Sequence, residues 1–303
     1  MIQKRPYEFM TKYTQQTNWI DGRGNFIAFA FFLGGISGGL FLASAFIDGI
    51  SSSQSLLGMF VAWLLSLGMG IAYMIHLTKP FRFWRMLSKP GTSWIARGFI
   101  FIMLFIGFTF LTLVLSMWAP NATGVITAFK ILAGIFAFAQ SIYTGFAVSY
   151  VSAIKIWNSA ILPILFVVCG FSGGLAILMG IVVGGSESQI MSVENVTRVT
   201  LISFAVILIV YLWNSTYSST AARDAVARMV GGSIASVFWV GVILLGVVIP
   251  IAISVATLFS HEPQVGLLII ATICEIIGGL TLRYVILKSG VYSPLVTSGG
   301  TEL

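Results

Sequence analysis

The sequence has little charge. Only 8% of its 303 residues are Asp, Glu, Lys or Arg, whereas 58% are hydrophobic. Soluble domains carry roughly 25% charged residues, so a surface built from this composition would not stay dissolved in water. The mean hydropathy of +1.01 therefore excludes a soluble globular protein and indicates a chain whose surface faces lipid.

Histidine and cysteine are also scarce, with two of each. His76 lies near one end of its predicted helix, and His261 lies in a predicted loop on the opposite side of the membrane. A hydrocarbon layer of ~30 Å therefore keeps them from sharing a haem iron. Cys169 and Cys274 provide too few thiols for an iron–sulfur cluster. No H-E-x-x-H motif, carboxylate dyad or nucleophile elbow occurs. We therefore expect no haem, no iron–sulfur cluster and no metal in this chain.

Long apolar runs dominate what remains. A membrane-spanning helix needs about 20 mostly apolar residues, whereas the strands of a membrane barrel alternate over roughly 10. The pattern predicts an all-α membrane protein with eight transmembrane helices. Their expected ranges are 25–48, 55–77, 95–118, 125–150, 157–183, 199–218, 231–258 and 265–287.

Positive charges are unevenly distributed between the two ends of these predicted helices. The polar N-terminal segment 1–24 lacks the short apolar core of a signal peptide. If this segment lies inside and each helix reverses direction, Lys130 and Arg198 are the only Lys or Arg outside. Loops rich in Lys and Arg stay in the cytoplasm. We therefore expect a multi-pass protein of the cell membrane, with the N-terminus and the tail 289–303 cytoplasmic.

Two glycine-rich stretches resemble each other. FFLGGISGGLFLAS at 31–44 aligns with FVVCGFSGGLAILM at 166–179, and each lies in the first helix of a set of four. An even number of helices separates them, so both helices run in the same direction. The alignment predicts two four-helix bundles, over 25–150 and 151–288. Helix packing alone also accounts for the glycines, because small residues let backbones approach closely.

The same alignment pairs Gln140 with Glu275, two polar residues within otherwise apolar helices. An ionisable residue at membrane depth is costly to desolvate and marks a functional site by default. One interpretation of Glu275 is a neutral, hydrogen-bonded carboxyl that bridges helices. The other is a proton path that includes Gln140 and Glu275 and extends to Asp48 and Arg283.

Further polar residues gather where the predicted helices meet the cytoplasmic side. Tyr143 lies about two turns inside its helix, and its hydroxyl needs a partner at that depth. Such residues suit a quinone, because they can hydrogen-bond its carbonyls and pass protons. The expected quinone-binding residues are Asn25, His76, Trp94, Arg97 and Tyr143. Trp94 and His76 equally fit a simple interfacial role.

Several of these stretches, taken in order, resemble the NrfD/PsrC-type membrane subunits of polysulfide reductase-like complexes. The resemblance runs from about Trp19 to the end of the last helix. It is carried by GGISGG, by HLTKPFRFW followed by SWIARG, by the Y-T-G at Tyr143–Gly145, and by WNSAILPILFVVCGFSGG. The family's Asn and His in the first helix do not map, because Phe26 and Ala30 stand in their places.

The resemblance implies a fold of two four-helix bundles and a function in electron transfer. It implies exchange of electrons between a quinone, menaquinone or ubiquinone, and an iron–sulfur subunit joined to a molybdopterin-type catalytic subunit. It assigns Tyr143 to the quinone, with His76 or Arg97 substituting for the unmatched ligands. It makes the basic loop the docking surface for the iron–sulfur subunit. The residues of that surface are Lys79, Arg82, Arg85 and Lys89.

Two other functions stay open at this point. A secondary transporter would use Glu275 and the repeated glycine-rich helices, although its repeats are more often inverted. A passive anchor would only hold a redox partner at the membrane. A co-purifying iron–sulfur subunit with bound quinone favours the redox subunit, and no nucleic-acid partner is expected.

Overall fold

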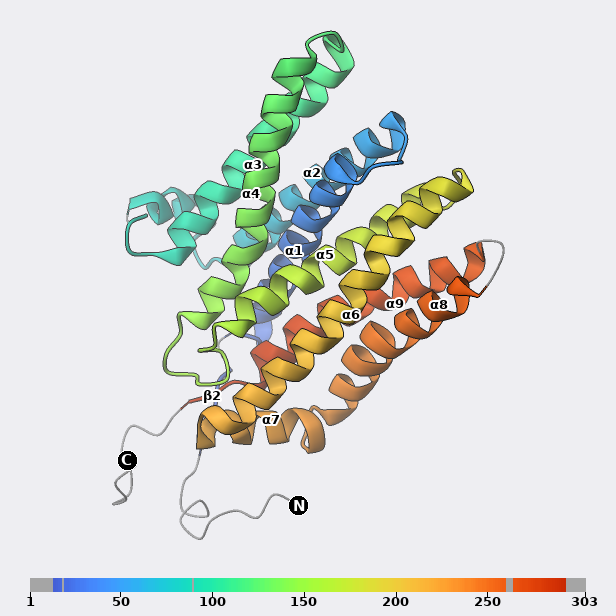
Figure 1. Cartoon of the computed structure of the whole chain (residues 1–303). Helices are drawn as coiled ribbons and strands as arrows, with labels where there is room; N and C mark the ends of the chain where they lie inside the picture. The colour runs from blue at the N-terminus through green and yellow to red at the C-terminus, as the bar shows by residue number, and fades with distance from the viewer. Residues whose placement is uncertain (1–12, 18, 89, 260–263, 293–303) are drawn as a thin grey trace.

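A computed structural model describes residues 13–17, 19–88, 90–259 and 264–292 of the protein (Figure 1). Helices account for almost all of this part. Eight spans within it are long and apolar enough to cross a membrane, which confirms the predicted all-α membrane protein. The elements are β1 Thr14–Gln15, η2 Gly22–Gly24, α1 Asn25–Phe46, α2 Ser52–His76, η3 Pro80–Ser88, α3 Trp94–Trp118, α4 Thr123–Ser149, α5 Ile161–Val182, α6 Glu187–Ser218, α7 Thr220–Gly231, η4 Val237–Val248, α8 Ile249–Leu258, α9 Val265–Ser289 and β2 Val291–Tyr292.

Helix α6 begins at Glu187 instead of residue 199, so the predicted start of this span was wrong. Ser186 forms a capping box with Gln189 at the new start, which satisfies backbone N–H groups that a helix end leaves unpaired. Glu194 and Arg198 form an ion pair one turn apart, with 3.0 Å between Oε1 and Nη2. Polar residues that hydropathy assigns to a loop therefore extend the helix.

The seventh span has two parts. The π-helix η4 runs over Val237–Val248 and continues directly into α8. Pro250 has no N–H and cannot bond to the carbonyl of Gly246, one turn earlier. A π-helical segment is rare and often accompanies a functional site. The span therefore changes from π-helical to α-helical geometry beside this proline.

Helices α1 and α5 cross at their glycine-rich stretches. A methyl group on Gly170 would lie 2.8 Å from the Cα of Gly35, and one on Gly174 would lie 2.9 Å from the Cα of Gly39. Both pairs are matched by the internal alignment. The repeat therefore packs against its own counterpart, as small residues spaced four apart allow.

The same two helices lie at the centre of the molecule. Helix α1 packs against α2, α4, α5 and α9, while α5 packs against α1, α4, α6 and α9 (Figure 1). Each central helix thus contacts the second and fourth spans of its own half. The arrangement as two separate bundles, divided at residue 150, stays a prediction.

The two ends of the described part lie together. Strand β1 pairs antiparallel with β2, with Thr14 opposite Tyr292, and β2 lies near α7 in Figure 1. Lys288 Nζ lies 2.8 Å from Asp21 Oδ1, and Gln16 donates a hydrogen bond to the carbonyl of Leu287. Both ends on one side agree with an even number of spans. Their placement in the cytoplasm stays a prediction.

Candidate functional site

The buried Tyr143 of α4 sits where three helices meet. Its hydroxyl donates a hydrogen bond to the hydroxyl of Tyr73 on α2, with 2.8 Å between the oxygens. Its ring lies so close to Gly98 of α3 that any side chain there would overlap it. Gly145 of the same Y-T-G motif meets Pro163 of α5, where a methyl group would come 3.0 Å from the Pro163 nitrogen. The motif thus combines one polar group with one close helix contact.

Tyr73 was not among the site residues predicted from the sequence, although it lies one turn before His76 on α2. Within the part of the protein that the structure describes, the hydrogen bond from Tyr143 is the one that the Tyr73 hydroxyl makes, so its own hydrogen is left to donate. Its side chain is half-buried. A phenol with an unused hydrogen therefore faces the same end of the helices as His76. The signal that could have found it is the three-residue spacing to His76.

His76 ends α2, as predicted, and joins it to the start of α1. Its Nδ1 lies 3.1 Å from the carbonyl oxygen of Arg23 in η2. A carbonyl only accepts hydrogen bonds, so Nδ1 carries the hydrogen and Nε2 is left as an acceptor in the neutral ring. Asn25 follows two residues after Arg23, exposed at the start of α1. The structure thus brings His76 and the Asn25 region together.

Arg97 and Trp94 form a second group at the start of α3. The Arg97 guanidinium carbon lies 4.8 Å from the centre of the Trp94 ring, and Trp94 stacks on Phe146 of α4 at 4.5 Å. Arg97 Nε donates to the carbonyl of Pro90 at 2.9 Å, which closes the turn before the helix. Gly98 follows Arg97 directly, so this group borders the Tyr143 ring.

The basic loop forms an exposed surface on η3. Lys79, Arg82 and Arg85 are all exposed, and Phe81 is 91% exposed. The Arg85 guanidinium lies 5.5 Å from the centre of the Trp84 ring. The fourth predicted docking residue, Lys89, lies outside the described residues.

Gln140 and Glu275 occupy equivalent places in the two halves, as the alignment predicts. Gln140 Nε2 lies 3.4 Å from Ser37 Oγ on α1, and Ser172 Oγ on α5 donates to Glu275 Oε2 at 2.8 Å. Ser37 and Ser172 are themselves an aligned pair. Both polar groups therefore bridge the fourth span of a half to its first, one as an amide and the other as a carboxyl.

Arg283 is fully buried between α1, α5 and α9. It donates to the carbonyl of Gly279 at 2.9 Å, to Cys169 Sγ at 3.2 Å and to the carbonyl of Phe166 at 3.2 Å. Its Nε has no partner among the described residues. Asp48, by contrast, is exposed and lies just after the C-terminal end of α1. The structure therefore separates Arg283 from Asp48.

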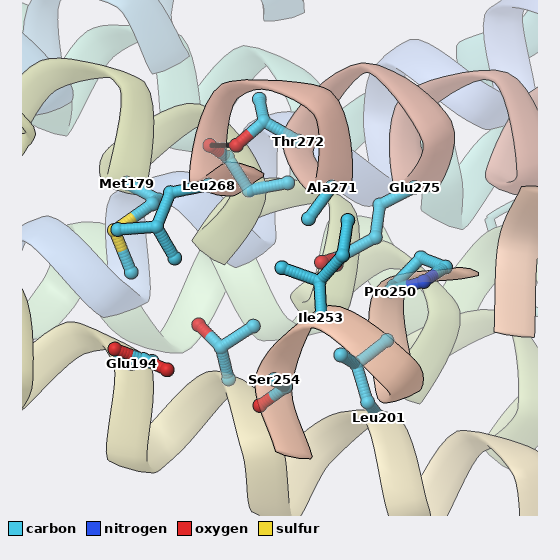
Figure 2. Close-up of a pocket in the computed structure, with 12 residues that line it drawn as sticks. Met179, Glu194, Leu201, Pro250, Ile253, Ser254, Leu268, Ala271, Thr272 and Glu275 are labelled. Carbon is cyan, nitrogen blue, oxygen red and sulfur yellow. Dashed lines mark hydrogen bonds between the residues drawn. The ribbon is translucent and has the colours of Figure 1, made fainter. Parts of the chain in front are cut away.

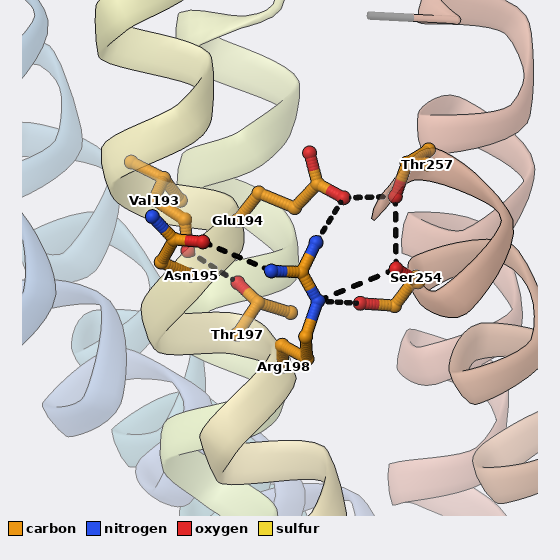
Figure 3. Close-up of polar contacts among 7 residues, drawn as sticks. All are labelled: Val193, Glu194, Asn195, Thr197, Arg198, Ser254 and Thr257. Atoms are coloured by element: carbon orange, nitrogen blue, oxygen red, sulfur yellow. Dashed lines mark hydrogen bonds and ion pairs between the residues drawn. The ribbon is translucent and has the colours of Figure 1, made fainter. Parts of the chain in front are cut away.

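A polar network that hydropathy placed in a loop connects α6 with α8 (Figure 3). Glu194 Oε1 accepts from Arg198 Nη2 at 3.0 Å and from the hydroxyl of Thr257. Arg198 Nε donates to Ser254 Oγ at 3.2 Å, and Nη1 donates to Asn195 Oδ1 at 2.9 Å. No sequence signal joined Glu194 to α8, because the contact depends on how α6 and α8 are rotated and tilted against each other.

Metal ligands do not cluster in the part of the protein that the structure covers. Within residues 13–17, 19–88, 90–259 and 264–292, no group of three or more His, Cys, Asp or Glu side chains could hold a metal ion.

Known proteins are similar to this sequence over most of its length. The family described as polysulphide reductase, NrfD matches residues 23–294. The C subunit of polysulfide reductase from Wolinella succinogenes is 25% identical over 301 residues, which cover 87% of the present sequence and 92% of the relative. A protein NrfD homolog of Haemophilus influenzae is 25% identical over 305 residues, covering 86% and 92%. Protein NrfD of Escherichia coli is 24% identical over 246 residues, covering 71% and 76%.

Proposed function

Because the chain belongs to the polysulphide reductase NrfD family, we propose that it is the quinone-reactive membrane subunit of an oxidoreductase complex. Electrons pass between menaquinone or ubiquinone and an iron–sulfur subunit, which is joined to a molybdopterin-type catalytic subunit. The complex lies in the cell membrane with both termini of this subunit in the cytoplasm. Proton exchange at the basic end accompanies the electron transfer.

The single observation that carries this proposal is the hydrogen-bonded pair of Tyr143 and Tyr73. Quinone carbonyls accept hydrogen bonds, and among the described residues the Tyr73 hydroxyl accepts from Tyr143 and keeps its own hydrogen to donate. Tyr143 holds the Tyr73 oxygen in place, and the two hydroxyls share one hydrogen bond, so one hydrogen of the pair is left to donate. These residues therefore fit a quinone headgroup. A bound quinone supplies chemistry in which electron transfer is coupled to proton transfer.

The surrounding residues have separate roles in this proposal. His76 stands one turn from Tyr73, and its Nε2 can accept a proton from solvent or return one to it. Trp94 and Arg97 form the rim of the site beside Tyr143, and Asn25 lies at the start of α1. The protein's own residues thus hold the headgroup and exchange protons.

The exposed basic loop serves as the docking surface for the iron–sulfur subunit. Lys79, Arg82 and Arg85 project from η3 and the residue before it, and Lys89 continues the same stretch of sequence. The loop joins α2 to α3, the helices that carry Tyr73 and Gly98. A partner bound there would be near the tyrosine pair, as electron transfer requires.

Substitution of the two tyrosines tests the function. In Tyr73→Phe the donor is lost, and we expect quinol-linked turnover at limiting quinol to fall about 100-fold, as for other positioned donors. In Tyr143→Phe the donor remains but is no longer held, so we expect a smaller fall of about tenfold. Tyr150→Phe is the matched control, because Tyr150 lies at the end of the same helix α4 and is exposed.

Assembly is measured in the same preparations by co-purification of the partner subunits. Unchanged turnover of an assembled Tyr73→Phe complex would contradict the quinone site and favour a passive anchor. A protein that purifies alone and shows gradient-driven uptake would instead favour a transporter that uses Glu275.

A further inference from the structure

A cavity of about 20 Å³ lies between α5, α6, α8 and α9 (Figure 2). It lies toward the start of α6, at the opposite end of the bundle from the basic loop in Figure 1. Two buried carboxyl groups line it, those of Glu194 on α6 and Glu275 on α9. Thr197 and Ser254 add hydroxyl groups. A space of this size holds one water molecule when several polar groups surround it. The cavity therefore has both the volume and the partners for a single bound water.

Glu275 faces this cavity with an unused acceptor. Its side chain reaches from α9 toward α8 in Figure 2, beside Ile253. Among the residues that the structure describes, the hydrogen bond that Ser172 donates to Oε2 is the one the carboxyl accepts, which leaves Oε1 available. The residue is only 6% exposed. A water in the cavity is thus the available route by which this carboxyl can exchange a proton.

Glu194 is the second carboxyl, and its partners occupy only one of its two oxygens. Oε1 accepts from Arg198 and Thr257, as Figure 3 shows, and Oε2 has no partner among the described residues. Arg198 is also held by Ser254 and by the exposed Asn195. The guanidinium therefore keeps hydrogen-bond partners when Glu194 is protonated. Asn195 places the network at the molecular surface.

We propose that Glu275 exchanges protons with the end of the molecule opposite the basic loop, through one water in this cavity and the Glu194 carboxylate. The Glu275 O–H bond breaks as its proton moves to the water oxygen, and another proton of that water bonds to Glu194. Glu194 then releases a proton to solvent beside Asn195. One proton moves and no electrons move. Only the use of this route during turnover rests on the proposed function.

Exchange of the Glu275 proton can be measured directly. The assembled complex in lipid vesicles is transferred from H₂O to D₂O, and infrared spectroscopy follows the carboxylic acid C=O band that Glu275→Gln removes. We expect Glu194→Gln to slow the band shift about 100-fold, the lower end of what a positioned proton carrier contributes. Ala271→Val should slow it similarly, because Ala271 lines the cavity and added methyl groups displace the water while both carboxyls remain.

Two matched controls should exchange at the wild-type rate. Glu187→Gln makes the same chemical change at an exposed position of α6, and Ala252→Val makes the same size change at an exposed position of α8. Wild-type exchange in Glu194→Gln, or the lack of any band removed by Glu275→Gln, would overturn the proposal. Because this readout needs no quinol turnover, Tyr73→Phe should leave it unchanged. The failure of the quinone site is therefore distinguishable from the failure of the proton route.

Discussion

Replacement of Gly170 by alanine tests the α1–α5 crossing on which the whole arrangement of helices depends. The added Cβ would lie 2.8 Å from the Cα, the carbonyl carbon and the carbonyl oxygen of Gly35. Carbon atoms in contact prefer about 3.5 Å or more. Backbone atoms cannot rotate away as a flexible side chain can, so the two helices must separate.

The expected cost follows from this geometry. Overpacking of a close-packed interior costs about 1–3 kcal/mol, and the rigid neighbour places Gly170→Ala at the upper end, about 3 kcal/mol. That loss lowers the folding equilibrium constant about 100-fold. The free energy of unfolding is measured by titration with sodium dodecyl sulfate in mixed micelles, with tryptophan fluorescence as the signal.

Gly180→Ala is the control on the same helix. Gly180 is exposed, and an added Cβ would meet no atom within 4 Å. Alanine is favoured over glycine in a helix by roughly 0.5–1 kcal/mol, so this substitution should raise the free energy of unfolding slightly. If the two variants unfold within about 1 kcal/mol of each other, the close crossing of α1 and α5 is refuted.

Two further substitutions test other contacts. Trp157 is fully buried, and its Nε1 donates a hydrogen bond to the carbonyl of Ile286 at 2.8 Å. Trp157→Phe should therefore lower the free energy of unfolding by about 2 kcal/mol in the same titration. An unchanged free energy would show that this hydrogen bond contributes nothing. Arg82→Glu should weaken co-purification of the iron–sulfur subunit about tenfold, because charge steers association. The loss should be larger at low salt, where charges are screened less. Lys155 is an exposed cation in the loop between α4 and α5, and Lys155→Glu should change the co-purification little. Equal effects of the two charge reversals would contradict docking at η3.

The two halves of the protein share a framework but differ in chemistry. At the aligned positions, Gln140 is an amide that cannot release a proton under ordinary conditions, whereas Glu275 is a carboxyl that can. The tyrosine pair belongs to the first half and the carboxyl pair to the second. In the proposals above, quinone binding and proton exchange with the opposite end are therefore carried by different halves.

Hydropathy alone located the eight spans, because a lipid solvent demands long apolar runs and satisfied backbone hydrogen bonds. The internal repeat also predicted that Gln140 and Glu275 would be equivalent. It did not predict the start of α6. The low hydropathy of the stretch with Glu187, Glu194 and Arg198 predicts a loop. A capping box and an ion pair between residues one turn apart nevertheless keep this polar stretch helical.

Residue order therefore determined the number of spans, the repeated glycine-rich stretches and the concentration of positive charge at one end. Those properties depend on composition and local spacing. Only the tertiary structure decided that Tyr73 is the partner of Tyr143 and that Glu194 and Glu275 line one cavity. Hydrogen-bond partners on different helices depend on how each helix is rotated and tilted against its neighbours. The close packing of backbones at Gly35 and Gly170 sets one of those angles, and no local pattern records it.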